Sequence, residues 1–191
     1  GIGFIVTVDL YNWGRKRVRK EERRPHLTLH TRIVLVSTAS LLVLGTVLTL
    51  GLEYDHTLKD LNFWEKLNAS FFQSVTARTA GYATIPQGEL GDATKLVTII
   101  LMFIGASPSS TGGGIKTTTF VVLVATVVSI SRGRDETVIN KRRVDKSVVY
   151  RAMTIVAMAF LVIAITSGVI MVTTPPEVSA IDAVYEAVSA F

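Results

Sequence analysis

The chain alternates between long uncharged, apolar stretches and shorter polar ones. Residues 33–52 are 20 positions without a charge, and residues 152–174 are 23. A helix rises 1.5 Å per residue, so 20 residues reach about 30 Å, the thickness of the hydrocarbon core of a bilayer. We therefore expect two membrane-spanning helices.

A third apolar stretch, residues 96–131, has 36 positions and a single charge, Lys116. It is too long for one span and too short for two spans joined by a proper loop. Residues 106–116 contain Pro108 and three consecutive glycines, which break helices. The pattern predicts a span broken into two apolar halves, 96–105 and 117–131. A simple connecting loop between two short helices is the alternative.

Residues 62–82 predict a short helix followed by a turn. Asn62 and Glu65 have the spacing of a capping box, and apolar and small residues then recur through about 16 residues of helix, which is short for a span. Gly81 suits a positive φ or a close backbone approach. Together they indicate a re-entrant loop, whose helix C-terminus and turn carbonyls favour a cation. A surface amphipathic helix with an ordinary loop is the alternative.

An internal repeat supports the re-entrant loop. FQSVTA at 72–77 and YEAVSA at 185–190 both read aromatic, polar, small, Val, hydroxyl, Ala. Each hexapeptide follows one of the two expected spans, and internal repeats are common in transport folds. We expect a repeated unit of span and short helix, and the chain ends where a second filter would begin.

Charge is segregated along the chain. The net charge is +5, yet residues 15–24 and 132–146 together hold 13 of the 20 bases and a net +8. Residues 53–95 carry a net −2 and the tail 177–186 a net −3. The positive-inside rule places the two basic runs on the cytoplasmic side, and every loop agrees. Basic runs that alternate with apolar spans do not indicate a DNA-binding surface, so we expect no nucleic-acid partner.

Several other protein classes do not fit. The absence of Cys excludes a disulfide framework and thiolate metal sites. A phosphate-binding P-loop fails because Ile115 separates Gly114 from Lys116 and no strand precedes the glycines. The chain starts at Gly1 without a signal-peptide pattern and ends within an apolar pattern, so we expect an interior fragment of a larger membrane protein. A processed small protein is the alternative.

TARTAGY at 76–82 and GASPSSTGGGIKTTTF at 105–120 resemble the Trk/Ktr/HKT family of potassium transporters, most closely its bacterial membrane (pore) subunits. The resemblance implies an all-α membrane protein in which four repeats of span, pore helix, filter and span surround one potassium-channel-like pore. Tyr82 stands where the family more usually has Phe. The implied parts are 1–14 (end of the second span of repeat two), 15–32 (cytoplasmic basic linker), 33–131 (repeat three), 132–149 (second basic linker) and 150–191 (repeat four, up to its filter).

The resemblance also implies functional residues. Backbone carbonyls of Thr79, Ala80 and Gly81 would coordinate potassium. An intramembrane gating loop would obstruct the pore below this filter. Its residues are Ser109, Ser110, Thr111, Gly112, Gly113, Gly114 and Lys116.

Potassium uptake across a bacterial plasma membrane is the implied function of a multi-pass protein without a cofactor. The implied partners are a second membrane subunit, forming a homodimer, a cytoplasmic nucleotide-binding regulatory ring and the lipid bilayer. Sodium or proton coupling, channel or symport, the Ktr or Trk subtype and the regulating nucleotide stay open. The expected absence of enzymatic activity has an alternative, a membrane-embedded enzyme with Ser109, Ser110 or Thr111 as nucleophile and Lys116 as base. A non-conducting assembly subunit is another.

Arg78 requires an explanation beside a cation filter. A positive charge 4 Å from the ion would repel it by up to about 4 kcal/mol at an effective dielectric constant near 20. We therefore expect its side chain to point behind the filter, towards an acid such as Glu89 or Asp92, in a scaffold role.

Overall fold

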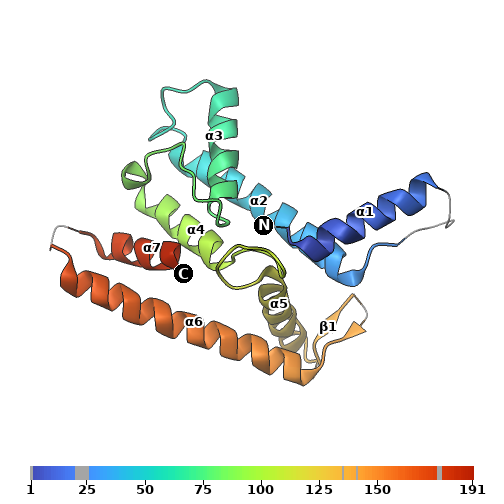
Figure 1. Ribbon diagram of the computed structural model, residues 1–191. Coiled ribbons are helices and arrows are strands. Elements are labelled where there is room, and N and C mark those ends of the chain that lie inside the picture. Colours follow the sequence, from blue (N-terminus) through green and yellow to red (C-terminus); the bar gives the residue numbers. More distant parts are fainter. Residues whose placement is uncertain (1, 20–25, 135, 141, 176–177) are drawn as a thin grey trace.

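The computed structural model describes residues 2–19, 26–134, 136–140, 142–175 and 178–191 (Figure 1). The fold is helical, with one small hairpin. Its elements are α1 (Phe4–Val18), α2 (Leu29–Glu53), α3 (Phe63–Thr76), η1 (Gln87–Glu89), α4 (Asp92–Phe103), α5 (Thr117–Ser131), β1 (Val138–Ile139), β2 (Arg142–Arg143), α6 (Lys146–Thr173) and α7 (Ala180–Ala190).

The two long helices α2 and α6 coincide with the expected spans. They have 25 and 28 residues, and both are long and apolar enough to cross a membrane. Thr28 caps α2 by accepting from Thr31 N, and Asp145 caps α6 by accepting from Ser147 N. Apolar side chains such as Phe160 and Val172 are exposed along α6. An apolar helix face of this size is unfavourable in water and favourable against lipid.

The short helix α3 begins as its capping box predicts. Asn62 Oδ1 accepts from Phe63 N at 2.7 Å, and Glu65 Oε2 accepts from Asn62 N at 2.9 Å. With 14 residues the helix is about 21 Å long, which is shorter than a bilayer core. It packs on α2, where Ser74 Oγ donates to Leu42 O at 3.0 Å.

Close approach of these helices depends on a glycine. A Cβ at Gly45 of α2 would overlap the Ser74 hydroxyl and lie 2.8 Å from Leu101 Cδ1 of α4. Three helices therefore meet at one position that has no room for a side chain. The neighbouring core consists of Leu41, Ala77, Leu101 and Ile104.

The predicted interruption of the third apolar stretch is present, and it fits both a broken span and a simple loop between two short helices. Helix α4 ends at Phe103, α5 begins at Thr117, and a non-helical segment joins them. Helix α7 follows α6 and packs against both α6 and α4. The order of a long helix and then a short one occurs at α2–α3 and again at α6–α7 (Figure 1).

The two basic linkers differ from the sequence prediction. Helix α1 continues to Val18, beyond the end expected near residue 14, and part of the first basic run, residues 20–25, lies outside the described residues. In the second linker, β1 and β2 pair antiparallel, with Val138 opposite Arg143. The fold is otherwise helical, as predicted, and strands of two residues leave no alternating pattern long enough to detect.

Candidate functional site: a turn after a short helix, packed against a glycine loop

The segment after α3 contains two left-handed residues. Thr79 has φ 65° and Gly81 has φ 77°. The positive φ predicted for Gly81 is confirmed, whereas Thr79 is β-branched, and a non-glycine residue in this region costs about 1–3 kcal/mol. Such a conformation persists only where the surrounding structure imposes it.

Hydrogen bonds close the turn onto the end of α3. Tyr82 N donates to Thr76 Oγ1 at 3.0 Å, the Thr76 hydroxyl donates to Tyr82 O, and Ala80 N donates to Thr76 O at 3.2 Å. Thr79, Ala80 and Gly81 are all exposed. The three residues proposed to coordinate an ion therefore form an exposed turn whose ends are both fixed to α3.

The segment joining α4 to α5, residues 104–116, is called the glycine loop below. It lies directly against the turn: a Cβ at Gly112 would overlap Thr79 Oγ1 and Ala106 Cβ. The two arms of the loop are joined, because Ala106 N donates to Gly113 O at 3.2 Å and Ile115 N donates to Phe103 O at 2.9 Å. A glycine at position 112 is what allows the loop and the turn to touch.

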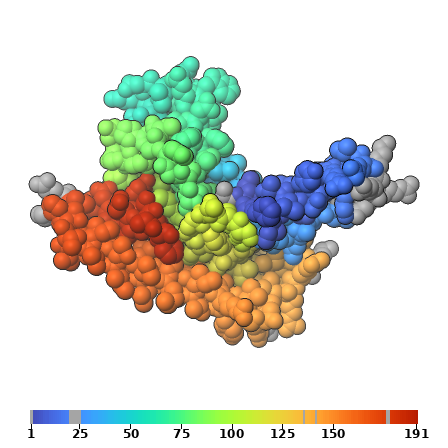
Figure 2. Space-filling model, viewed as in Figure 1, coloured from blue at the N-terminus to red at the C-terminus, as the bar shows by residue number. Residues whose placement is uncertain are grey.

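Two distant parts of the chain hold the loop on its other sides. Phe4 N of α1 donates to Ser109 O at 3.0 Å, and Gly114 N donates to Phe191 O, just after α7, at 3.4 Å. Figure 2 shows the loop (yellow) lying between α7 (red) and α1 (blue). The loop is thus a meeting point of α1, the turn after α3, and the end of α7.

Two cations donate to loop carbonyls. Lys116 Nζ donates to Gly112 O at 2.6 Å, and Arg78 Nη2 donates to Gly105 O at 3.3 Å. Arg78 is 8% exposed. Its expected acidic partner, Glu89 or Asp92, was wrong: the side chain turns instead to a carbonyl of the loop, which supplies a partial negative charge within the core.

The loop hydroxyls do not form a nucleophile–base pair with Lys116 in the described part of the chain. Ser110 Oγ donates to Ser107 O at 2.7 Å, and Ser109 and Thr111 are exposed. Lys116 uses its ammonium group on a backbone carbonyl. This arrangement serves loop conformation, since an ammonium that donates to a carbonyl is not acting as a base.

Sequence analysis missed a polar network beside the turn. The amides of Gln73 and Gln87 exchange two hydrogen bonds, at 2.8 and 3.1 Å, and Tyr185 of α7 donates to Gln87 Oε1 at 2.6 Å. Nearby, Lys95 of α4 and Asp182 of α7 form an ion pair at 2.6 Å. The partners in the Tyr185–Gln87 and Lys95–Asp182 contacts lie far apart in sequence, so no local motif signals these contacts.

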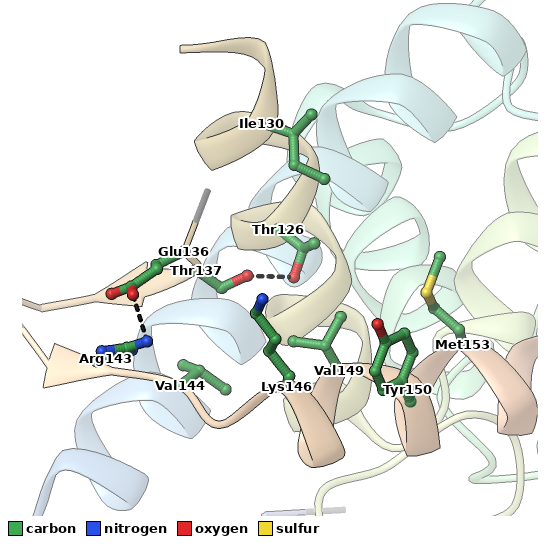
Figure 3. Close-up of a pocket in the computed structure, with 10 residues that line it drawn as sticks. All are labelled: Thr126, Ile130, Glu136, Thr137, Arg143, Val144, Lys146, Val149, Tyr150 and Met153. Atoms are coloured by element: carbon green, nitrogen blue, oxygen red, sulfur yellow. Dashed lines mark hydrogen bonds and ion pairs between the residues drawn. The ribbon is translucent and has the colours of Figure 1, made fainter. Parts of the chain in front are cut away.

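A separate pocket of about 300 Å³ lies between α5, the hairpin and α6 (Figure 3). The side chains of Glu136 and Arg143 form an ion pair at one edge, and Thr126 and Thr137 share a hydrogen bond of 2.9 Å. Lys146 is drawn beside Val149 and Tyr150 at the start of α6. The pocket combines charged side chains at its edge with apolar walls and lies within the second basic segment of the chain.

Two helices long and apolar enough to cross a membrane, together with shorter helices joined by non-helical segments, are typical of a helical membrane protein. Residues 1–191 match the family described as "TrkH: Cation transport protein", and the chain belongs to this family. A family of transporters places the chain in a membrane.

Several known proteins are similar to this chain. The Ktr system potassium uptake protein B of Bacillus subtilis is 35% identical over 193 residues, and the potassium/sodium uptake protein NtpJ of Enterococcus hirae is 37% identical over 194. Each alignment covers 100% of this chain and 41% of the relative, so the chain spans about two fifths of their length.

A solved structure supports the fold. The potassium transporter TrkH from Vibrio parahaemolyticus matches with a TM-score of 0.69 at 18% identity, over 97% of this chain and 40% of that one. At this identity the similarity shows the fold alone.

Proposed function

We propose that this chain belongs to a potassium uptake protein and carries its third pore repeat and the start of its fourth. The observation that carries the proposal is the exposed turn of Thr79, Ala80 and Gly81 at the C-terminal end of the half-length helix α3. A helix C-terminus bears about half a negative charge, and backbone carbonyls can replace the hydration shell of potassium. The turn would be one quarter of a selectivity filter.

The glycine loop would be the gate. Its contact with Thr79 puts residues 109–116 next to the filter segment, where they would obstruct the path of an ion. Lys116 holds the loop by its bond to Gly112 O, and its positive charge adds repulsion against a passing cation. In this proposal opening requires the loop to leave the filter segment.

The rest of the proposal concerns assembly. Residues 33–131 would form repeat three, and residues 150–191 would form repeat four up to its filter. The complete pore therefore needs the parts of the parent protein outside this chain. The parent would be a multi-pass homodimer in the bacterial plasma membrane. A cytoplasmic nucleotide-binding ring would meet the inner face, where the basic hairpin β1–β2 and the pocket of Figure 3 offer a surface. The name of NtpJ, a potassium/sodium uptake protein, makes sodium the first coupling ion to test.

The filter assignment is tested at Gly81. We expect Gly81→Ser in the full-length parent, expressed in cells unable to take up potassium, to lower the preference for potassium over sodium about fivefold or more. The added Cβ has open space, so the effect comes from forcing a side chain into φ 77°, which costs about 1 kcal/mol or more.

Gly88→Ser is the matched control, because a Cβ added at Gly88 would also meet no atom within 4 Å and Gly88 is not among the positive-φ glycines. Ion-selective uptake assays of both variants against wild type make the comparison. Unchanged uptake and unchanged selectivity in Gly81→Ser would contradict the filter assignment.

A further inference from the structure

Arg78 is a buried cation immediately before the proposed filter. Its Nη2 donates to Gly105 O, 27 residues further along the chain, at 3.3 Å. Its Nε is buried and has no hydrogen-bond partner among the described residues. A guanidinium has five N–H donors, and at least the one on Nε is unused among the described residues. In the described part of the chain, the acceptor of its hydrogen bond is a carbonyl of the glycine loop.

The loop touches the filter segment at a second point. Gly105, on the first arm, accepts from Arg78, and Gly112, on the second arm, lies against Thr79. The two arms also pack on each other, because a Cβ at Gly105 would overlap the carbonyl oxygen of Gly113. A displacement of the loop as one body must therefore break both contacts with consecutive residues of the filter segment, Arg78 and Thr79.

We propose that Arg78 is a positioning residue that couples the filter to the glycine loop, so that potassium bound in the filter holds the loop closed and loss of the ion releases it. This inference rests on the proposed function. Arg78 directly precedes Thr79, whose left-handed backbone needs support from its surroundings. In this proposal, an ion coordinated by the Thr79 carbonyl supplies that support. Relaxation of Thr79 in an empty filter would move Arg78 and weaken its hydrogen bond to Gly105 O.

The unused Nε donor lets the guanidinium form a different hydrogen bond once it leaves Gly105 O. In this proposal the second bonded arrangement makes the element two-state instead of continuously deformable. An ion shifts such an equilibrium by its differential affinity for the two states, and couplings between two sites usually amount to 5–150-fold.

Accessibility of the loop tip tests the coupling. This chain has no Cys and Thr111 is exposed, so Thr111→Cys can serve as a reporter in a cysteine-free full-length parent reconstituted in liposomes. The rate of modification by a small water-soluble thiol reagent is measured in potassium and in an impermeant cation. We expect potassium to slow modification about fivefold or more. With Arg78→Gln, modification should be fast in both solutions.

The matched control is Lys66→Gln. Lys66 is also a buried cation that donates to a backbone carbonyl, Tyr54 O at 2.7 Å, but it lies near the start of α3, whereas Arg78 follows the end of α3. We expect this variant to keep the potassium effect. A second variant, Gly112→Ala, breaks the other contact by driving a Cβ into Thr79 and should also abolish the effect, which keeps the test valid if Arg78→Gln does not fold.

Potassium uptake by the same liposomes separates two kinds of failure. If the protein without the Arg78, Gly112 or Lys66 substitutions takes up potassium but potassium does not change the rate of thiol modification, the coupling is wrong and the proposed function stands. Retention of the potassium effect in Arg78→Gln or in Gly112→Ala would also overturn the coupling, as would its loss in Lys66→Gln. If wild type takes up no potassium, the proposed function is wrong and the inference falls with it.

Discussion

At the scale of single residues, two cationic side chains hold the candidate site together by donating hydrogen bonds to backbone carbonyls. Lys116 and Arg78 each donate to a carbonyl of the glycine loop, so neither needs an acidic partner at membrane depth. The positive φ of Gly81 was predictable, because a glycine after a helix is a local signal, and Lys116 stands out in the sequence as a lone cation in an apolar stretch; their proposed roles stay predictions. Sequence reasoning assigned Arg78 the wrong partner, because the chain brings residue 105 next to residue 78 only through the packing of α4 against α2.

Lys116 gives a test of the closed loop. We expect Lys116→Met to raise resting potassium uptake by the parent about tenfold, because a hydrogen bond to a charged group contributes about 1.5–3 kcal/mol and the closed loop would lose it. Lys59→Met, which removes an exposed lysine, is the control and should leave uptake unchanged. The measurement is tracer uptake of potassium by the variants and wild type at equal expression. A folded Lys116→Met protein with wild-type or lower uptake would argue against a gate.

At the scale of elements, the sequence predicted the helices well and the loops poorly. Residues 33–52 lie inside α2, and the start of α5 at Thr117 matches the prediction, because apolar periodicity and glycine breaks are local. Helix α6 begins six residues before the uncharged stretch, since Asp145 caps a turn that contains charges. The hairpin at 138–143 was missed, because a basic run favours exposure without specifying a conformation.

The capping box of α3 should contribute measurably to stability. Asn62→Ala removes the acceptor for Phe63 N, so we expect a loss of about 1 kcal/mol in the free energy of unfolding and a lower Tm. Asn68→Ala, at an exposed position within the same helix, should leave stability unchanged or slightly raised because Ala favours a helix interior. Thermal unfolding of the parent in detergent compares the two, and equal Tm values would show that tertiary packing alone fixes the start of α3.

At the scale of the whole molecule, polar contacts join parts that the sequence keeps separate. Tyr185 and Asp182 of α7 bind Gln87 and Lys95, so α7 is tied to the segments that follow α3 and the turn. These contacts span 98 and 87 positions along the chain. No hydrophobic pattern encodes such pairings, which is why the repeat suggested that α7 exists but not where it docks.

The Lys95–Asp182 pair can be tested by exchanging its charges. Lys95→Asp and Asp182→Lys should each lower the Tm of the parent, and the double exchange should recover part of the loss. Lys95 is 10% exposed and Asp182 41%, so solvent screens the pair and we expect a coupling energy of about 1 kcal/mol. Additive losses in the double variant would mean that the pair does not hold α7 in place.

The contacts of the glycine loop also order the events of biogenesis. One side of the loop is bound by Phe4 of α1, and the other by Phe191, just after α7. Helix α7 follows the loop in the sequence, so during synthesis the loop lacks its contact with Phe191 until α7 has been made. If the loop is the gate that we propose, its closed form would gain this support only after α7 has been inserted.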